Sequence, residues 1–121
     1  MQAMAGLVMR KAGKSVLVLE KTDLLGGSTA KAGGVMWIPN NRFMAKAGIE
    51  DSLEQAETYL NAVVEAQEGD APGTSRERRR TYIVEANRML DFLIGQGIKF
   101  GRNPYWPDYY SSRPGGTAPG R

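Results

Sequence analysis

A short apolar run followed by glycine-rich sequence constrains the fold of this chain more than any other feature. Residues 15–20 read SVLVLE, an apolar segment with polar boundaries, which is typical of a parallel strand covered on both faces. The preceding residues 1–12 are rich in Ala, Met, Leu and Lys and predict a helix, and Gly13 stands where a left-handed C-cap belongs. A helix, a glycine and a short strand that ends in an acid, Glu20, form the second half of a β-α-β unit. We therefore expect an α/β fold whose first strand lies before Met1.

Glu20 stands where dinucleotide-binding folds carry an acid that accepts hydrogen bonds from the ribose hydroxyls of the adenosine half. The glycine motif that accompanies such an acid, G-x-G-x-x-G, lies about 20 residues earlier, so its last glycine would fall at or just before Met1. The sequence thus predicts part of a Rossmann-like domain that lacks its first strand and phosphate loop. On these features alone, an exposed acid that solubilises a strand end explains Glu20 equally well.

A glycine-rich stretch, LLGGSTAKAGG at residues 24–34, predicts a loop because glycine permits positive φ angles and close backbone approach. With its neighbours, as EKTDLLGGSTAKAGGVMWIPNN, it resembles the FAD-binding segment of the flavoprotein family that includes fumarate reductase flavoprotein subunits and 3-ketosteroid Δ1-dehydrogenases. The resemblance implies FAD as the cofactor. A flexible linker is the alternative, although a linker is not expected to connect a buried strand directly to VMWIP.

The resemblance also implies which side chains contact the cofactor. The acid would bind the adenosine ribose and the lysine after it would flank the adenine. The Gly-Ser-Thr run would contact the pyrophosphate and the flavin region, and the small residues after it would lie against the isoalloxazine ring, because only small residues let a backbone lie on a flat ring. The implied cofactor-binding residues are Glu20, Lys21, Gly27, Ser28, Thr29, Ala32, Gly33 and Gly34.

Two longer helices with marked ends are predicted in the middle of the chain. Residues 52–55 form a capping box before an apolar stripe that continues to about residue 67, and residues 74–77 form a second box before a stripe that Gly97 ends. Residues 68–75 connect the two helices, and a shorter helix is predicted over residues 42–47. We expect a partial FAD-binding domain in residues 1–50, then this helical pair and the start of a substrate or catalytic domain in residues 51–121.

The C-terminal segment, NPYWPDYYSSRPGGTAPGR, resembles the part of 3-ketosteroid Δ1-dehydrogenases in which an aromatic residue, P-D-Y-Y, a glycine-rich stretch and G-R follow in this order. The resemblance implies that Tyr109 is a catalytic residue that helps to remove hydrogen from C1 and C2 of the steroid A ring. It places Trp106 in an aromatic wall of the substrate pocket and leaves Tyr110 structural. The alternative is that these aromatic residues, with Tyr105, only fasten a loop to the core.

Composition excludes several other chemistries. The chain has no cysteine and no histidine, so disulfides, thiolate catalysis, the usual zinc sites and histidine acid–base catalysis are absent, and no metal site is predicted. The net charge is +3, and four arginines crowd one helix start: Arg76, Arg78, Arg79 and Arg80. They could contact nucleic-acid phosphates, but their place on an amphipathic helix favours a solvated face, and no nucleic-acid partner is expected.

The expected function is that of a fragment, truncated at both ends, of an FAD-dependent oxidoreductase that 1,2-dehydrogenates a 3-ketosteroid, with the hydride passing to the flavin. Alone, the chain is expected to be inactive and a poor FAD binder. Another fumarate-reductase-type dehydrogenase and a small helical interaction protein are the alternatives. No apolar run approaches the ~20 residues that a membrane span needs, and no leader pattern is present, so we expect a cytoplasmic protein with a small-molecule substrate.

Overall fold

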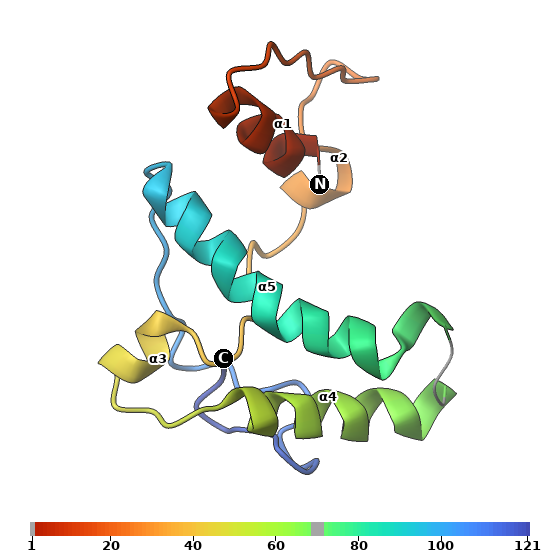
Figure 1. The fold of residues 1–121 in the computed structure, drawn as a ribbon, viewed down its shortest axis with the longest axis vertical. Coiled ribbons are helices and arrows are strands. Elements are labelled where there is room, and N and C mark those ends of the chain that lie inside the picture. Colours follow the sequence, from red (N-terminus) through yellow and green to blue (C-terminus); the bar gives the residue numbers. More distant parts are fainter. Residues whose placement is uncertain (1, 69–71) are drawn as a thin grey trace. The chain divides into compact units, whose positions relative to one another are not determined.

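A computed structural model describes residues 2–68 and 72–121 (Figure 1). In the described residues the elements are, in chain order, α1 (Gln2–Lys11), α2 (Gly27–Ala30), α3 (Arg42–Lys46), α4 (Leu53–Glu68), the 3₁₀ turn η1 (Pro72–Thr74) and α5 (Arg76–Gly95), with no strand among them. The chain divides into two compact units, Met1–Met36 and Trp37–Arg121. None of the described helices is both long and apolar enough to cross a membrane.

The first unit begins with helix α1, in good agreement with the predicted helix over residues 1–12. Gly13 has a φ of 75°, and the Lys14 N–H donates to the Met9 carbonyl at 3.0 Å, which confirms the predicted glycine C-cap. Residues 14–20 have neither helical nor strand structure, and the side chains in this run are exposed. A strand is stable only beside a partner strand, so the predicted strand and the Rossmann-like fold stay predictions.

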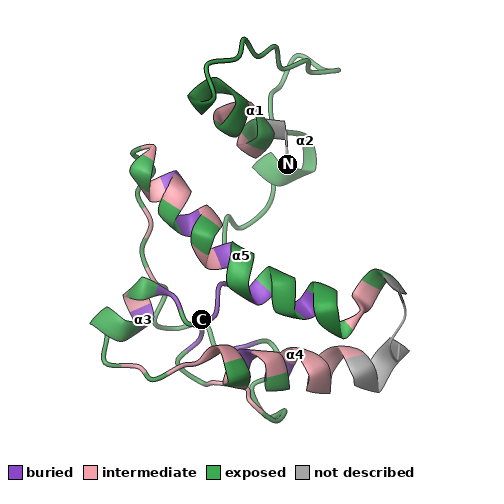
Figure 2. Cartoon of the chain, in the orientation of Figure 1, coloured by how far each residue is buried: buried purple, intermediate pink, exposed green. Residues whose placement is uncertain are grey.

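The second unit is built on the pair of helices α4 and α5, and both were predicted with nearly these bounds. Apolar residues of α5 recur at helical spacing on the buried face that Figure 2 shows in purple. The core cluster joins Ala86 and Leu90 of α5 to Ile38, and Phe43 of α3 packs against it. The segment just before α3 is therefore fixed to α5 by apolar burial.

The helix ends show which capping signals the chain uses. The Gln55 N–H donates to Ser52 Oγ at 3.1 Å, as the first capping box predicts. The second predicted box is wrong by one residue: Ser75 caps α5 through the Arg78 N–H at 3.4 Å, because Thr74 belongs to the turn η1. Gly97 ends the helix with a φ of 90°, as predicted. The predicted connection over residues 68–75 lies partly outside the described residues.

Two arginines of the run at the start of α5 bind side chains of α4. Arg79 is buried, and its guanidinium donates from Nε to Asn61 Oδ1 at 2.8 Å and from Nη1 to the Thr74 carbonyl. Arg80 pairs with Glu57 of α4 at 2.8 Å. The prediction of a solvated face is therefore wrong for Arg79, because an amide on the facing helix and a turn carbonyl supply the partners that a buried guanidinium needs.

Candidate functional site

The predicted ribose-binding acid lies in an exposed turn. Oε1 of Glu20 accepts the backbone N–H groups of Lys21 at 2.6 Å and of Thr22 at 3.1 Å. These two bonds, that from Thr22 first, lower the pKa of Glu20 below its usual value. Glu20 is therefore an ionised, solvent-facing acceptor at neutral pH, which is the chemistry that ribose hydroxyls require.

The predicted phosphate-contacting run begins at a glycine turn that other residues would not adopt. Gly26 has a φ of 104° and Gly27 a φ of 51°, and they lead into the single helical turn α2. A Cβ atom on Gly26 would lie 2.8 Å from the Cβ of Ala30, which is too close for two carbon atoms. Ser28 and Thr29 follow on α2 with their side chains exposed. The turn thus presents two hydroxyl groups beside a backbone position, Gly26, that has no room for a side chain.

The flavin-facing residues of the prediction, Ala32, Gly33 and Gly34, are exposed as well. Gly34 has a φ of 72°, and a Cβ atom there would meet nothing within 4 Å. The absence of side chains from this stretch leaves room for a flat ring against the backbone. Together with an ionised acid and two hydroxyls, these groups fit the ribose, pyrophosphate and ring system of FAD, and the role of each residue stays a prediction.

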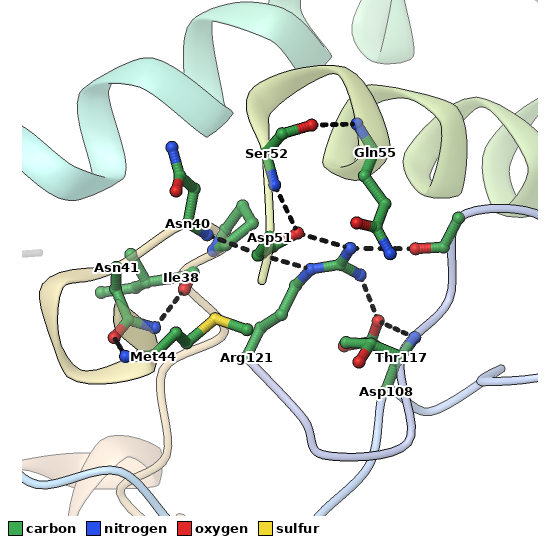
Figure 3. A network of polar contacts seen from close by, with 12 residues as sticks. Ile38, Asn40, Asn41, Met44, Asp51, Ser52, Gln55, Asp108, Thr117 and Arg121 are labelled. Carbon is green, nitrogen blue, oxygen red and sulfur yellow. Dashed lines mark hydrogen bonds and ion pairs between the residues drawn. The ribbon is translucent and has the colours of Figure 1, made fainter. Parts of the chain in front are cut away.

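The second predicted site, the loop that carries Trp106 and Tyr109, is organised by a buried acid (Figure 3). Asp108 is 1% exposed. Its Oδ1 accepts the Trp37 indole N–H at 2.7 Å, and its Oδ2 accepts the Thr117 N–H at 3.0 Å. Its own N–H donates to the Thr117 carbonyl at 3.0 Å. The two sides of the loop are therefore joined where Asp108 meets Thr117.

A buried arginine completes this network, as the dashed lines in Figure 3 show. The Arg121 guanidinium donates to Asp51 from Nε at 2.8 Å and from Nη2 at 2.9 Å, and to Asp108 from Nη1. The three side chains are at most 1% exposed. Two carboxylates and one fully engaged guanidinium form a buried cluster, termed here the Asp51–Arg121–Asp108 clamp.

Aromatic rings surround the clamp. Trp37 stacks on Tyr82 with ring centroids 6.2 Å apart and meets Tyr59 at 5.7 Å. The Arg121 guanidinium carbon lies 5.8 Å from the Trp37 ring centroid and 5.6 Å from that of Tyr59. The Tyr59 hydroxyl also accepts the Tyr110 N–H at 3.0 Å. These contacts fix the loop to α4, α5 and the residue that begins the second unit.

The predicted catalytic side chain points away from this framework. Tyr109 is 91% exposed and Trp106 is 53% exposed, and Tyr105 is exposed as well. Tyr109 contacts the edge of Tyr110, with ring centroids 5.0 Å apart and an interplanar angle of 74°. The alternative in which these aromatic residues fasten the loop is wrong for the rings of Tyr105 and Tyr109, which lie in solvent, and it stays open for the half-buried Trp106.

Sequence reasoning missed the clamp residues Asp51, Asp108 and Arg121 and their partner Trp37. Two of them were visible in the motif, as the Asp of P-D-Y-Y and the Arg of the final G-R. The pairing with Asp51 spans 70 residues and had no local signal.

The profile of the FAD binding domain family matches residues 3–121. The chain belongs to this family. FAD, the predicted cofactor, is therefore confirmed as the cofactor of the domain.

Several curated relatives of this FAD binding domain are similar over most of its length. A 3-oxosteroid 1-dehydrogenase of Mycolicibacterium smegmatis is 36% identical over 118 residues, and one of Mycobacterium tuberculosis is 38% identical over 118 residues. A 4-oxocyclohexanecarboxylate 2-dehydrogenase of Sinomonas cyclohexanicum is 37% identical over 119 residues. Each alignment covers 97% of this chain and 20% of the relative. The chain thus spans about a fifth of the length of these relatives, and no solved structure matches it significantly.

Proposed function

We propose that the chain is the portion of an FAD-dependent 3-oxosteroid 1-dehydrogenase that contributes cofactor contacts and one catalytic tyrosine. The observation that carries the proposal is the exposed phenol of Tyr109, on a loop that buried groups hold rigidly. Its support from relatives is the 36% and 38% identity to enzymes named 3-oxosteroid 1-dehydrogenase. We further propose that residues 1–50 form part of a Rossmann-like FAD-binding domain, and that residues 51–121 begin the catalytic domain.

The proposed reaction removes one hydride and one proton from neighbouring carbons. The C2 proton lies next to the C3 carbonyl and is the acidic one, so it leaves as a proton, the C1 hydrogen leaves as a hydride, and a C1=C2 double bond forms. When bound, FAD supplies the hydride acceptor. The phenolate form of a tyrosine can take up the C2 proton, and the neutral phenol of Tyr109 can relay it by passing its own proton to an acceptor as it takes the new one. Trp106 would form an apolar wall beside the ring that reacts.

The cofactor contacts are proposed for the exposed turn of the first unit. Glu20 would accept hydrogen bonds from the ribose hydroxyls, since its carboxylate is ionised and faces solvent. Ser28 and Thr29 would donate hydroxyl hydrogen bonds to the pyrophosphate. Gly34 and its neighbours would lie against the flavin ring, where a side chain would block close approach.

A different cyclic ketone is the second candidate, because the 4-oxocyclohexanecarboxylate 2-dehydrogenase is as similar as the steroid enzymes. That substrate carries a carboxylate, which calls for an accessible cation. In the described loop, the Arg121 side chain is 0% exposed and already binds two carboxylates. Arg113 of the same loop is exposed and is an accessible cation, so the choice between the two substrates depends on a turnover assay. The predicted alternative of a helical interaction protein loses support from the family match over residues 3–121.

A segment exchange tests the proposal. Residues 3–121 replace the matching segment of the Mycolicibacterium smegmatis enzyme, and flavin content and turnover of a 3-ketosteroid are measured with an artificial electron acceptor. We expect Tyr109→Phe to abolish most turnover while flavin content stays unchanged, with Tyr110→Phe as the matched control. Glu20→Gln should lower flavin content instead. A chimera that binds flavin and turns over only 4-oxocyclohexanecarboxylate would favour the second candidate.

A further inference from the structure

The loop that carries Tyr109 is fixed on both sides of that residue. On one side, Asp108 is buried and bonded through its carboxylate and its backbone N–H. On the other side, the Tyr110 N–H donates to the Tyr59 hydroxyl at 3.0 Å. Tyr109 itself has its ring in solvent. An exposed side chain thus stands between two anchored neighbours, an arrangement that orients the ring without covering it.

Hydrogen-bond donors hold the carboxyl group of Asp108 in this position. The partners of its two oxygens are an indole N–H, a backbone N–H and a guanidinium, and all three are donors. No water reaches a side chain that is 0% exposed. A buried carboxylate needs a nearby cation, because its desolvation is otherwise too costly.

Arg121 supplies that cation and also holds three segments of the chain together by hydrogen bonds. Its planar guanidinium donates to Asp51, which lies just before α4, to Asp108 in the loop, and from Nη2 to the Gly115 carbonyl at 2.9 Å. Three segments of chain therefore meet on one rigid fork. A lysine ammonium has no such fork and could not reproduce these directions together.

We propose that Arg121 is a positioning residue: it sets the direction of the Tyr109 ring by holding Asp108, and Trp37 is the second group that acts through Asp108. The inference rests on the proposed function for the catalytic meaning of Tyr109. The geometric claim, however, is separate, because it concerns only how the loop is held. It also links the site to the cofactor segment along the chain, since Trp37 follows Gly34 after two residues.

Nuclear magnetic resonance of the 121-residue chain tests the geometric claim without flavin or substrate. The variants are Arg121→Gln, Arg121→Lys and Trp37→Phe, with Arg113→Gln as the control because Arg113 is an exposed arginine of the same loop. Three signals are measured: the Trp37 indole N–H shift, hydrogen exchange of the Asp108 and Thr117 amides, and the ring-current shifts that Tyr110 imposes on the Tyr109 ring.

We expect Arg121→Gln to move the indole signal upfield, to speed exchange of the two loop amides by at least about tenfold, and to abolish the Tyr109 ring-current shifts. Arg121→Lys should give the same changes, whereas Arg113→Gln should give none. Amides of α5 should change far less than those of the loop. If Arg121→Gln unfolds the whole unit, Trp37→Phe replaces it, because that change removes one donor and keeps an aromatic ring.

Several results would overturn the proposal. The first is an unshifted Tyr109 ring in Arg121→Gln while the helices stay folded, or in Trp37→Phe where Arg121→Gln unfolds. The second is an equal effect of Arg113→Gln, which would mean that loop charge matters and the clamp does not. The third is full rescue by Arg121→Lys, which would reduce Arg121 to a counter-charge. None of these results depends on turnover, so a failure of the steroid assignment would leave them readable.

Discussion

Replacing Asp108 with asparagine should destabilise the second unit far more than the loss of one surface charge. Asparagine has nearly the same shape, but its amide must turn an NH₂ group toward one side of the site. The three partners there are the Trp37 indole, the Thr117 N–H and the Arg121 guanidinium, and all of them donate. One donor is therefore left facing another donor in a site without solvent.

The magnitude follows from these contacts. An unsatisfied buried group costs about 1–3 kcal/mol, and the bonds that survive lose their charge-assisted part. Arg121 keeps its two bonds to Asp51, so the loss should fall short of a fully broken buried pair. We expect about 3 kcal/mol. With a urea dependence of about 1.5 kcal/mol per molar, the midpoint should fall by about 2 M.

Urea unfolding followed by circular dichroism at pH 7 measures this shift. Asp91→Asn is the matched control, because Asp91 pairs with Arg42 at 3.2 Å in an exposed position where both side chains are more than half exposed. Such a pair contributes at most about 1 kcal/mol. A midpoint for Asp108→Asn that falls no further than that of Asp91→Asn would refute the reasoning.

Three further predictions use the same unfolding assay. Ile83→Ala should lower the free energy of unfolding by about 2–5 kcal/mol, because Ile83 is 1% exposed, whereas Val84→Ala on the exposed side of α5 should have little effect. Arg79→Met should cost about 2 kcal/mol because it removes the hydrogen bonds that the buried guanidinium donates to Asn61 and to the Thr74 carbonyl, whereas Arg88→Met should stay within about 0.5 kcal/mol; equal losses would contradict the assigned role. Burial raises the pKa of Tyr59 above its usual value of 10.0, so the fold favours the neutral phenol. The stability that the neutral Tyr59 contributes is fully present below pH 10.0 and is lost as the pH rises through the raised pKa. The free energy of unfolding should therefore fall above about pH 10, and it should fall less steeply in Tyr59→Phe.

Local sequence rules predicted the elements whose signals are local. The helical pair, the short helix α3 and the glycine ends at Gly13 and Gly97 all follow from apolar spacing and capping chemistry, and the structure has each of them. The second cap moved by one residue because Thr74 and Ser75 are both good caps, and only the turn η1 decides between them. Residue type shows which residues can cap a helix, and the preceding backbone, here the turn η1, decides which of them does.

The polar core could not be predicted in the same way. Arg79 looks like its exposed neighbours in the run, and only its phase on α5 turns it toward Asn61. Asp51 and Arg121 lie 70 positions apart and have no shared local pattern. The strand predicted at residues 15–20 is the opposite case: its sequence pattern is strong, but a strand needs a paired neighbour, and the described residues provide none.

Neighbouring residues of one motif can therefore have different roles, one in the stability of a loop and the other at its surface. In P-D-Y-Y, Asp108 is buried and bonded on every side, whereas Tyr109 is in solvent with only an edge contact to the next ring. Substitution of either residue would lower turnover in an enzyme that uses Tyr109, so activity alone does not separate their roles. Stability does, because Tyr109→Phe removes a hydroxyl that the described fold does not bury, whereas Asp108→Asn breaks the clamp. The stability of the loop that carries the exposed Tyr109 thus comes from the buried residue beside it.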